Sequence, residues 1–314
     1  MTRDLGQGQD DRQARKEELP TASGDTVAHV DNLNRDDFYR EFVAKRKPVV
    51  IHNMMSEWRA RSWSPEYFKH GYSTRLPVKQ GNVADGQLET VSLSSYAELL
   101  ERYEAQLQAG SAPERPGYLH DVPLFRVIPA LRSDVEPFPL HLFPRWYRQN
   151  WPNYVQFFMG PTGSVTPLHF DTLLTNNLFF QVAGRKRFVL IPDDQRGLCY
   201  TYNWRWAQFD PTAPDFAKFP LAERVTPAAV VLEPGDILYM PPGTLHHVTS
   251  LSLTISFNID WHTAASAARG MTSVARGAPR KNGYYNLVSL LGVGLGIPDR
   301  YLYPLYKSYL TYVS

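Results

Sequence analysis

The sequence holds 314 residues, of which 43% are hydrophobic, 13% aromatic and 20% charged. This balance excludes a disordered protein, and the length suffices for one large domain or two small ones. Lysine and arginine total 33 against 31 acidic residues, and the formal net charge of +2 argues against nucleic acid as the main partner. The single cysteine, Cys199, excludes an internal disulfide and a cysteine-rich zinc site. These features are typical of a globular protein of the cytoplasm.

Residues 1–25 are polar and contain no apolar run, so we expect a disordered tail there. The missing apolar run argues against a secretory signal peptide, and acidic residues such as Asp10 and Glu17 argue against a mitochondrial presequence. No stretch approaches the roughly 18 uninterrupted apolar residues that a membrane span requires. We therefore expect no membrane partner.

Before residue 150 the pattern favours helices around one short strand. Asn34 is a potential cap for a helix over 33–46, and 48–51 is expected as a buried strand. Ser64 followed by Pro65 is typical of a helix start. A further helix over 93–106 is predicted from the near-helical spacing of its apolar residues, Leu93, Tyr96, Leu99, Leu100 and Tyr103.

From about residue 153 the pattern changes to short β-rich runs separated by turns. Many short strands with turn residues between them indicate a mainly β protein, an antiparallel sandwich or a small barrel. We expect the aromatic and proline-rich insert 195–228 to cover one mouth of that barrel. The expected strands are 153–159, 165–170, 177–182, 186–191, 229–232, 236–240 and 253–260.

Two segments bring together residue types that bind metals. His169 and Asp171 form an H-x-D pair, and they would project together if 166–171 is a strand, because residues i and i+2 share a face. Further along, His246 and His247 enter the next strand after the turn P-P-G-T. Two histidines and one carboxylate form the facial triad that holds non-haem Fe(II) and leaves positions open for other ligands.

The order of the motifs T-P-x-H-x-D, N-x-F-F-Q-x-x-G-x-K-R, P-G-D-x-L-Y-x-P and H-H-V resembles the cupin-type JmjC fold of 2-oxoglutarate-dependent oxygenases. Within that group the sequence is most similar to the asparaginyl hydroxylases of the factor inhibiting HIF type and their bacterial cupin-like relatives, over roughly residues 30–262. The resemblance implies a double-stranded β-helix, or jelly roll, with flanking N-terminal and C-terminal helices. It also implies Fe(II), the co-substrate 2-oxoglutarate and O2. We expect a catalytic domain over 26–265 and a helical segment over 266–314.

The resemblance also implies roles for individual residues. His169, Asp171 and His246 would bind the metal, because the family's last ligand lies two residues before a valine or isoleucine. The alternative, with His247 as the ligand and His246 structural, stays open. Lys186 would pair with the distal carboxylate of 2-oxoglutarate, although a basic hairpin of no special function has the same spacing. The weaker matches are Tyr118, Thr166 and Asn177 as co-substrate contacts and Asn258 near the metal.

The sequence departs from the family pattern before Asn177, where the departure affects the alignment of Asn177, and at residue 260, a position that lies near the substrate in the family. Two extra residues lie between Asp171 and Asn177, Asp260 stands where the family has a tryptophan, and Trp261 is displaced by one position. The aromatic insert around 200–209 is also particular to this sequence. The substrate of the asparaginyl hydroxylases therefore does not transfer directly to this chain.

We expect a hydroxylase acting at the β-carbon of an amino-acid side chain in a peptide or protein, for example a natural-product precursor peptide. The family analogy makes Asp171 favour hydroxylation over halogenation, and the near-neutral charge counts against histone tails. Two alternatives stay open: a cupin-like module that only binds a metal or a partner, and a hydroxylase of a free amino acid or small molecule. Related hydroxylases dimerise through C-terminal helices, so we expect a homodimer here, with packing of this segment on its own barrel as the alternative. Pro304 is expected to begin a final helix with Leu305, Tyr309 and Tyr312 on one face.

Overall fold

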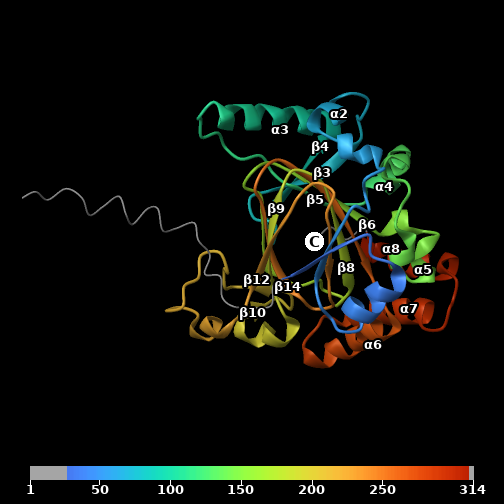
Figure 1. The fold of residues 1–314 in the computed structure, drawn as a ribbon. Coiled ribbons are helices and arrows are strands. Elements are labelled where there is room, and N and C mark those ends of the chain that lie inside the picture. Colours follow the sequence, from blue (N-terminus) through green and yellow to red (C-terminus); the bar gives the residue numbers. More distant parts are fainter. Residues whose placement is uncertain (1–26, 311–314) are drawn as a thin grey trace, which may run out of the picture.

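A computed structural model describes residues 27–310, and its centre is a pair of facing β-sheets (Figure 1). The first sheet has seven strands in the order β1-β2-β13-β8-β15-β6-β5, and the second has six in the order β10-β11-β7-β14-β9-β12. Apart from the parallel pair β1–β2, the strands pair antiparallel, as in the predicted jelly roll. A hairpin of β3 and β4 stands beside the two sheets. The strands are β1 (Ala28–Asp31), β2 (Val49–His52), β3 (Arg75–Gln80), β4 (Gln87–Ser92), β5 (Leu119–Val122), β6 (Val155–Gly160), β7 (Val165–His169), β8 (Asn176–Ala183), β9 (Lys186–Ile191), β10 (Thr201–Tyr202), β11 (Trp206–Ala207), β12 (Ala228–Leu232), β13 (Ile237–Met240), β14 (Leu245–Ser250) and β15 (Thr254–Trp261).

The central strand β15 contributes side chains both to the hydrophobic core and to the space between the sheets. All eight of its residues are buried, and polar and apolar side chains alternate along it. Because successive side chains of a strand point to opposite faces, its polar residues line the space between the sheets and its apolar ones face outward. The inward polar residues are Ser256, Asn258 and Asp260.

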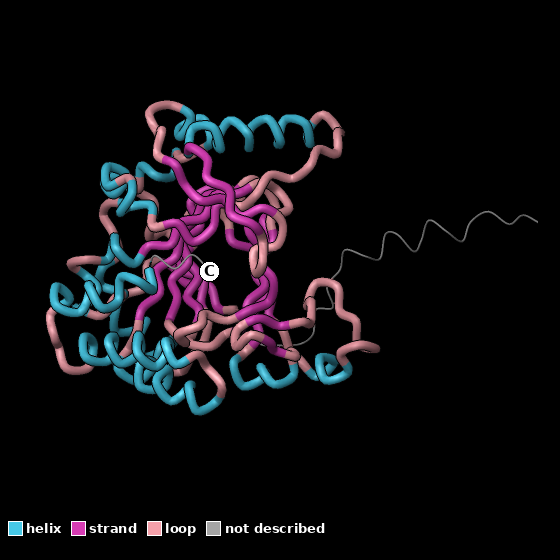
Figure 2. The backbone as a smooth tube through the Cα atoms, turned by 180° about the vertical axis from the view of Figure 1, so that it is seen from behind, coloured by secondary structure: helices cyan, strands magenta, loops and turns pink. Residues whose placement is uncertain are grey.

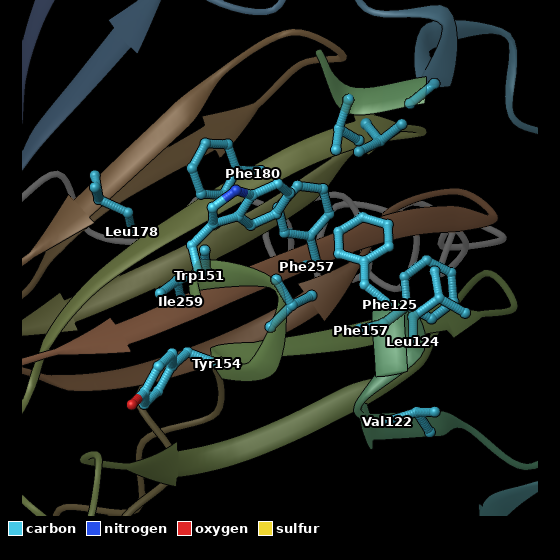
Figure 3. Close-up of a cluster of buried hydrophobic side chains, with 14 of the residues drawn as sticks. Val122, Leu124, Phe125, Trp151, Tyr154, Phe157, Leu178, Phe180, Phe257 and Ile259 are labelled. Atoms are coloured by element: carbon cyan, nitrogen blue, oxygen red, sulfur yellow. The ribbon is translucent and has the colours of Figure 1, made fainter. Parts of the chain in front are cut away.

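The outer face of the first sheet packs against helices and forms the main hydrophobic core. Figure 3 shows Phe180 and Phe257 from neighbouring strands beside Trp151. The rings of Phe180 and Phe257 stack with centroids 4.8 Å apart. In Figure 2 most helices gather along one side of the strands. The α-helices are α1 (Arg35–Asp37), α2 (Pro65–Lys69), α3 (Leu93–Gln108), α4 (Leu124–Val127), α5 (Arg145–Arg148), α6 (Ala264–Thr272), α7 (Arg280–Val293) and α8 (Asp299–Leu310).

Several local predictions are confirmed. Asn34 caps α1, which continues as a wider π-helical turn (Phe38–Val43), and Ser64 caps α2 ahead of Pro65. The predicted strands correspond to β2, β6, β7, β8, β9, β12, β13 and β15, although β7 ends at His169, before Asp171. In α3 the expected apolar face is buried except for Leu99, which is 38% exposed.

The prediction for the last helix was wrong. Pro304 lies inside α8, which begins five residues earlier at Asp299. Contacts with the rest of the chain fix this earlier start, because Asp299 accepts hydrogen bonds from Tyr154 and Asn150. The buried side chains of α8 include Leu302 and Tyr306, whereas the expected Leu305 is exposed. Tyr312, like the expected tail over 1–25, lies outside the described residues.

The C-terminal helices pack against their own chain. Trp146 donates a hydrogen bond from Nε1 to the carbonyl of Ile297, and a Cβ on Gly292 would lie 2.3 Å from the Trp146 ring, so only glycine fits this contact. In Figure 1 α6, α7 and α8 lie together beside the sheets. Among the described helices none is both long and apolar enough to cross a membrane.

Candidate metal centre and cavity

The structure brings His169, Asp171 and His246 together in the space between the sheets. Their candidate ligand atoms all lie within 4.8 Å of one another. His169 and His246 are direct cross-strand partners of β7 and β14, and their ring centroids are 4.2 Å apart. Asp171 lies just beyond the end of β7, so a strand end and a following turn place the carboxylate beside the two imidazoles.

The two histidines are held in the form that binds metals. His169 Nδ1 lies 2.8 Å from the carbonyl of Pro167, and His246 Nδ1 lies 3.2 Å from the carbonyl of Thr244. A carbonyl can only accept, so each Nδ1 carries the proton and each Nε2 keeps its lone pair. Burial lowers the pKa of both residues, and the neighbouring His246 lowers that of His169 further. Both imidazoles are therefore neutral at physiological pH.

The adjacent His247 lies on the opposite face of β14. Its Nε2 is 3.9 Å from Asp210 in the aromatic insert, and it lines a separate surface hollow. Neighbouring strand residues point to opposite faces, so only one of the two histidines can meet His169. The geometry places His246 there.

Lys186 is the buried cation of the same cavity. Its Nζ donates hydrogen bonds to Tyr118 Oη and Ser256 Oγ, both at 2.8 Å, and lies 5.3 Å and 5.0 Å from the ring centroids of Phe158 and Phe179. None of the ion pairs among the described residues includes it. Burial lowers its pKa to about 7, because no negative charge compensates for lost hydration.

A tight turn positions Lys186 at the start of β9. Gly184 has a positive φ of 69°, and a Cβ there would lie 1.9 Å from the carbonyl of Leu253, so glycine is required. Arg185 is exposed and pairs with Glu233. The hairpin therefore sends one basic side chain inward and its neighbour outward.

The remaining predicted site residues also line this cavity. Thr166 lies near His120, with 3.5 Å between Oγ1 and Nε2. Asn177 Nδ2 donates to Asp171 Oδ2 at 3.2 Å and to Asp260 Oδ1 at 2.9 Å, so it connects two carboxylates. Asn258 Nδ2 lies 3.4 Å from the same Asp260 oxygen. All eight residues selected from the sequence thus line one cavity.

Thr166 and His169 face the same cavity although they are three residues apart. The pairing of β7 with β14 shifts register between His246 and Val248, opposite this stretch. Pro167 lies in this stretch of β7 and has no N–H for a hydrogen bond to the neighbouring strand. A proline within a strand is typical of such an irregularity in pairing.

Sequence reasoning missed several cavity residues. Ser256 could have been found from its position two residues before Asn258 on the same strand face. His120 could likewise have been found from its position two residues after Tyr118, whereas Gln156 and Arg205 come from segments with no motif. Asp260 was noted only as a departure from the family pattern.

A second hollow is lined partly by the same residues as the metal cavity, Asp121, Gln156, Thr172 and Arg205, so the two lie side by side. The aromatic insert and helix α7 form its walls. Its other lining residues include Trp204, Trp206, Lys281, Asn282 and Tyr285.

The profile of the cupin-like domain family matches residues 35–267. The chain belongs to the cupin-like domain family. The match ends before α7, so the hollow beside the cavity combines residues of the cupin-like domain with residues that follow it.

Individual relatives carry the name JmjC or the name of an oxygenase. The chain is 30% identical over 244 residues to JmjC domain-containing protein D of Dictyostelium discoideum, covering 70% of this chain and 53% of that protein. It is 31% identical to lysine-specific demethylase JMJ30 of Arabidopsis thaliana, over 75% of this chain and 54% of the relative. It is 25% identical to 2-oxoglutarate and iron-dependent oxygenase JMJD4 of Gallus gallus, over 79% and 62%.

The chain thus spans about half the length of the first two relatives. These names agree with the predicted cupin-type JmjC fold. None of the three is named as an asparaginyl hydroxylase, and that finer resemblance stays a prediction.

The residues of this cupin-like chain fit the metal and co-substrate that the family implies. Two neutral imidazoles with free Nε2 atoms and one carboxylate are the donor set of non-haem Fe(II) oxygenases. A buried lysine with no anionic partner among the described residues is a matching hydrogen-bond donor and counter-charge for one carboxylate of a dicarboxylate.

Proposed function

We propose that the chain is an Fe(II)- and 2-oxoglutarate-dependent hydroxylase that acts at the β-carbon of an amino-acid side chain in a peptide or protein. The observation that carries the proposal is the presence of an open His-Asp-His triad and the uncompensated Lys186 in one cavity. Bound iron supplies the oxygen chemistry, in which 2-oxoglutarate and O2 yield succinate and CO2 and one oxygen atom enters a substrate C–H bond.

The chain's own residues bind and orient the reactants. Lys186 Nζ has three N–H groups, two of which bond Tyr118 and Ser256, so the third is available to the distal carboxylate of 2-oxoglutarate. The aromatic rings around Nζ exclude water and strengthen that charge pair. Asn177 fixes the carboxylate of Asp171 through its hydrogen bond, which orients a metal ligand.

The rival function is a cupin-like module that only binds a metal or partner. Such a module needs no buried lysine beside the triad, and burying an uncompensated ammonium group lowers stability. Relatives named oxygenase or demethylase also favour an enzyme.

The proposed substrate class, a peptide or protein, rests on the hollow beside the metal cavity and on the names of the relatives. A hollow walled by tryptophan and tyrosine side chains next to the cavity suits a peptide. Relatives named lysine-specific demethylase 8 and arginine-specific demethylase JMJ20 support protein side chains as substrates. Product mass separates the two reactions, since hydroxylation adds one oxygen and demethylation removes one CH2.

The test uses the two neighbouring histidines as a matched pair. Purified protein is incubated with Fe(II), ascorbate, 2-oxoglutarate and candidate peptides, and succinate is measured. We expect His246→Ala to abolish succinate formation and tight Fe(II) binding, while His247→Ala keeps both, because His247 faces the other side of β14. Succinate from the unsubstituted protein that does not exceed the His246→Ala level contradicts the proposal.

The expected homodimer stays a prediction. The C-terminal helices contact their own chain, yet Leu287, Tyr301 and Leu305 keep 42%, 60% and 47% of their surface exposed. Light scattering coupled to size exclusion measures the oligomeric state, and a monomeric mass rules the dimer out.

A further inference from the structure

A surface hollow of about 360 Å³ lies on the outer side of the first sheet, away from the metal cavity. Its walls come from α4, from the 3₁₀ helix Pro129–Val135 and from the chain that runs from the end of α5 into the 3₁₀ helix Trp151–Tyr154. Phe125 of α4 lines the hollow and contacts Phe257 of β15, with ring centroids 5.8 Å apart (Figure 3). Phe257 belongs to the outward, apolar side of β15, so the sheet separates this hollow from the metal cavity.

The charged residues among those that line the hollow are two arginines, Arg126 and Arg132. Neither side chain forms an ion pair or a hydrogen bond with another described residue. In Arg126 the Nη1 atom is buried and has no acceptor. A guanidinium that has lost part of its hydration without gaining a counter-charge pairs more strongly with an anion than a fully hydrated one does.

The acidic residues of the neighbouring segments do not neutralise these arginines. Asp134, in the same 3₁₀ helix as Arg132, is buried and pairs with Arg59 at 3.0 Å. Asp299 of α8 accepts a hydrogen bond from Asn150, which lines the hollow. The exposed Glu136 forms no ion pair among the described residues either. Two positive charges therefore remain at the hollow.

Neutral donors accompany the two arginines. Gln149 and Asn153 line the hollow, and neither side chain is hydrogen-bonded to another described residue. Each carries an amide NH2 group, whereas the amide nitrogen of Asn150 is already used on Asp299. The hollow thus offers two guanidinium groups and two amides to a ligand with several acceptor oxygens.

Charge and size narrow the class of anion. A phosphate monoester carries about −1.5 to −2 charges at pH 7 and has three strong acceptor oxygens, so it matches two arginines better than a single carboxylate does. The volume of about 360 Å³ falls in the range of small-molecule sites, about 300–1,000 Å³, and leaves room for an organic group beside the phosphate.

We propose that this hollow binds a small phosphate monoester, with Arg126 and Arg132 paired to its phosphate oxygens. Gln149 and Asn153 would donate further hydrogen bonds to the same ligand. A nucleotide and a sugar phosphate share this chemistry, and binding measurements separate the two. The inference goes beyond the proposed hydroxylase activity and does not depend on it, because none of these four residues lines the metal cavity.

The experiment compares ligands that differ only in the phosphate group: adenosine monophosphate with adenosine, and glucose 6-phosphate with glucose. Binding to the full-length protein is measured by calorimetry. We expect at least one ester to bind about tenfold or more tightly than its neutral counterpart, as for other hydrogen bonds between charged groups. Inorganic phosphate should compete with that ester, and acetate at the same concentration should not. Lys186→Met removes the cation of the metal cavity, the other place where an anion could bind, and should keep the preference.

Substitutions in the hollow locate the binding. Arg126→Gln and Arg132→Gln should each weaken binding of the ester about tenfold, and Arg126→Lys, which keeps the charge without the planar fork, should recover only part of the loss. The matched control is Arg102→Gln, an exposed arginine of α3 that forms no ion pair among the described residues, and it should keep full affinity.

Equal binding of both esters and their neutral counterparts by the unsubstituted protein, including no binding of any, overturns the inference, and this comparison does not depend on any variant folding. Unchanged affinity in folded Arg126→Gln and Arg132→Gln overturns it too. Loss of the preference in Lys186→Met would assign the phosphate to the metal cavity and likewise contradict the proposal. Competition by acetate as strong as that by inorganic phosphate would contradict the phosphate class.

Discussion

At one end of the cavity Ser256 of β15 receives a hydrogen bond from the buried Lys186, and at the other end Asp260 of the same strand is a buried carboxyl group. Burial lowers the pKa of the cation and raises that of the anion, so in both cases it disfavours the charged form. Neutral groups bond both side chains: a tyrosine and a serine at one end, two asparagines at the other.

The ion pairs of Asp193, elsewhere in the chain, contrast with the buried charged groups of the cavity. Asp193 has a side chain only 12% exposed, and both Arg269 and Arg46 pair with it. There the protein itself supplies the opposite charge. No ion pair among the described residues includes Lys186, which is the arrangement expected where a ligand brings the missing negative charge. Asp260 forms no ion pair among them either, although the charge of Arg205 acts on it.

Of the predicted effects, the largest is expected when the buried cation Lys186 is replaced by a neutral residue. Lys186→Met should raise the 2-oxoglutarate concentration needed for half-maximal succinate formation by about ten- to hundredfold, because a charge-assisted contact contributes about 1.5–3 kcal/mol. Fe(II) affinity should stay unchanged, since Lys186 does not contact the triad.

Arg187→Met is the matched control for Lys186→Met. Arg187 is the next residue of β9 and is partly exposed, so its loss should not change the requirement for 2-oxoglutarate. An equal requirement in Lys186→Met and the unsubstituted protein would remove Lys186 from the co-substrate site.

The motifs explain why the sequence located the triad and Lys186 but not the whole cavity. His169 and Asp171 are close in sequence, and Lys186 follows a recognisable glycine turn, so local patterns identify them. The link between Asn177 and Asp260 joins residues 83 positions apart and depends on the pairing of β8 with β15. No spacing rule within one segment shows such a contact.

Tertiary contacts also explain where local rules failed. Proline favours the first turn of a helix, which predicts a start at Pro304. Asp299 begins the helix earlier because Tyr154 and Asn150 bond its carboxylate, and Tyr306 packs against Tyr154 with ring centroids 5.9 Å apart. Short strands separated by turn residues are local features, and they predicted an antiparallel sandwich or a small barrel. The resemblance of the motifs to the JmjC family then implied the jelly roll.

A somewhat smaller change in the affinity for 2-oxoglutarate is expected when the pH is raised. Lys186 has a pKa of about 7 without the co-substrate, and a bound carboxylate should raise it, so binding takes up a proton when the pH is above 7. The affinity for 2-oxoglutarate should therefore fall as pH rises, by about tenfold between pH 7 and 8.5. Binding of 2-oxoglutarate measured by calorimetry in buffers of different ionisation enthalpy checks both the affinity and the proton uptake.

The other titratable groups near Lys186 do not mimic this behaviour. Burial raises the pKa of Tyr118 above its usual value of 10 and lowers that of His120, so both stay neutral over this range. Lys186→Arg keeps its charge at all these pH values and should bind 2-oxoglutarate with little pH dependence. The same decline in affinity in Lys186→Arg would assign the titration to another group.

The smallest effect on succinate formation is expected from a substitution in α7, which supports the loop after Asp171. Asn282 Nδ2 donates to the carbonyl of Thr172 at 3.0 Å, and Trp204 Nε1 donates to the same oxygen at 3.0 Å. Asn282→Ala removes one of these two supports, so we expect succinate formation to fall by about three- to tenfold, as for loss of a net hydrogen bond of about 1 kcal/mol.

Asn286→Ala is the matched control for Asn282→Ala, because it removes another buried asparagine of α7, whose Nδ2 bonds its own helix rather than the loop. Both variants should lower the melting temperature by a few degrees, as about 1 kcal/mol predicts for a chain of this size. Only Asn282→Ala should also weaken Fe(II) binding, since Thr172 follows the candidate ligand Asp171 directly. Equal Fe(II) affinity in the two variants would show that α7 stabilises the fold without positioning the metal site.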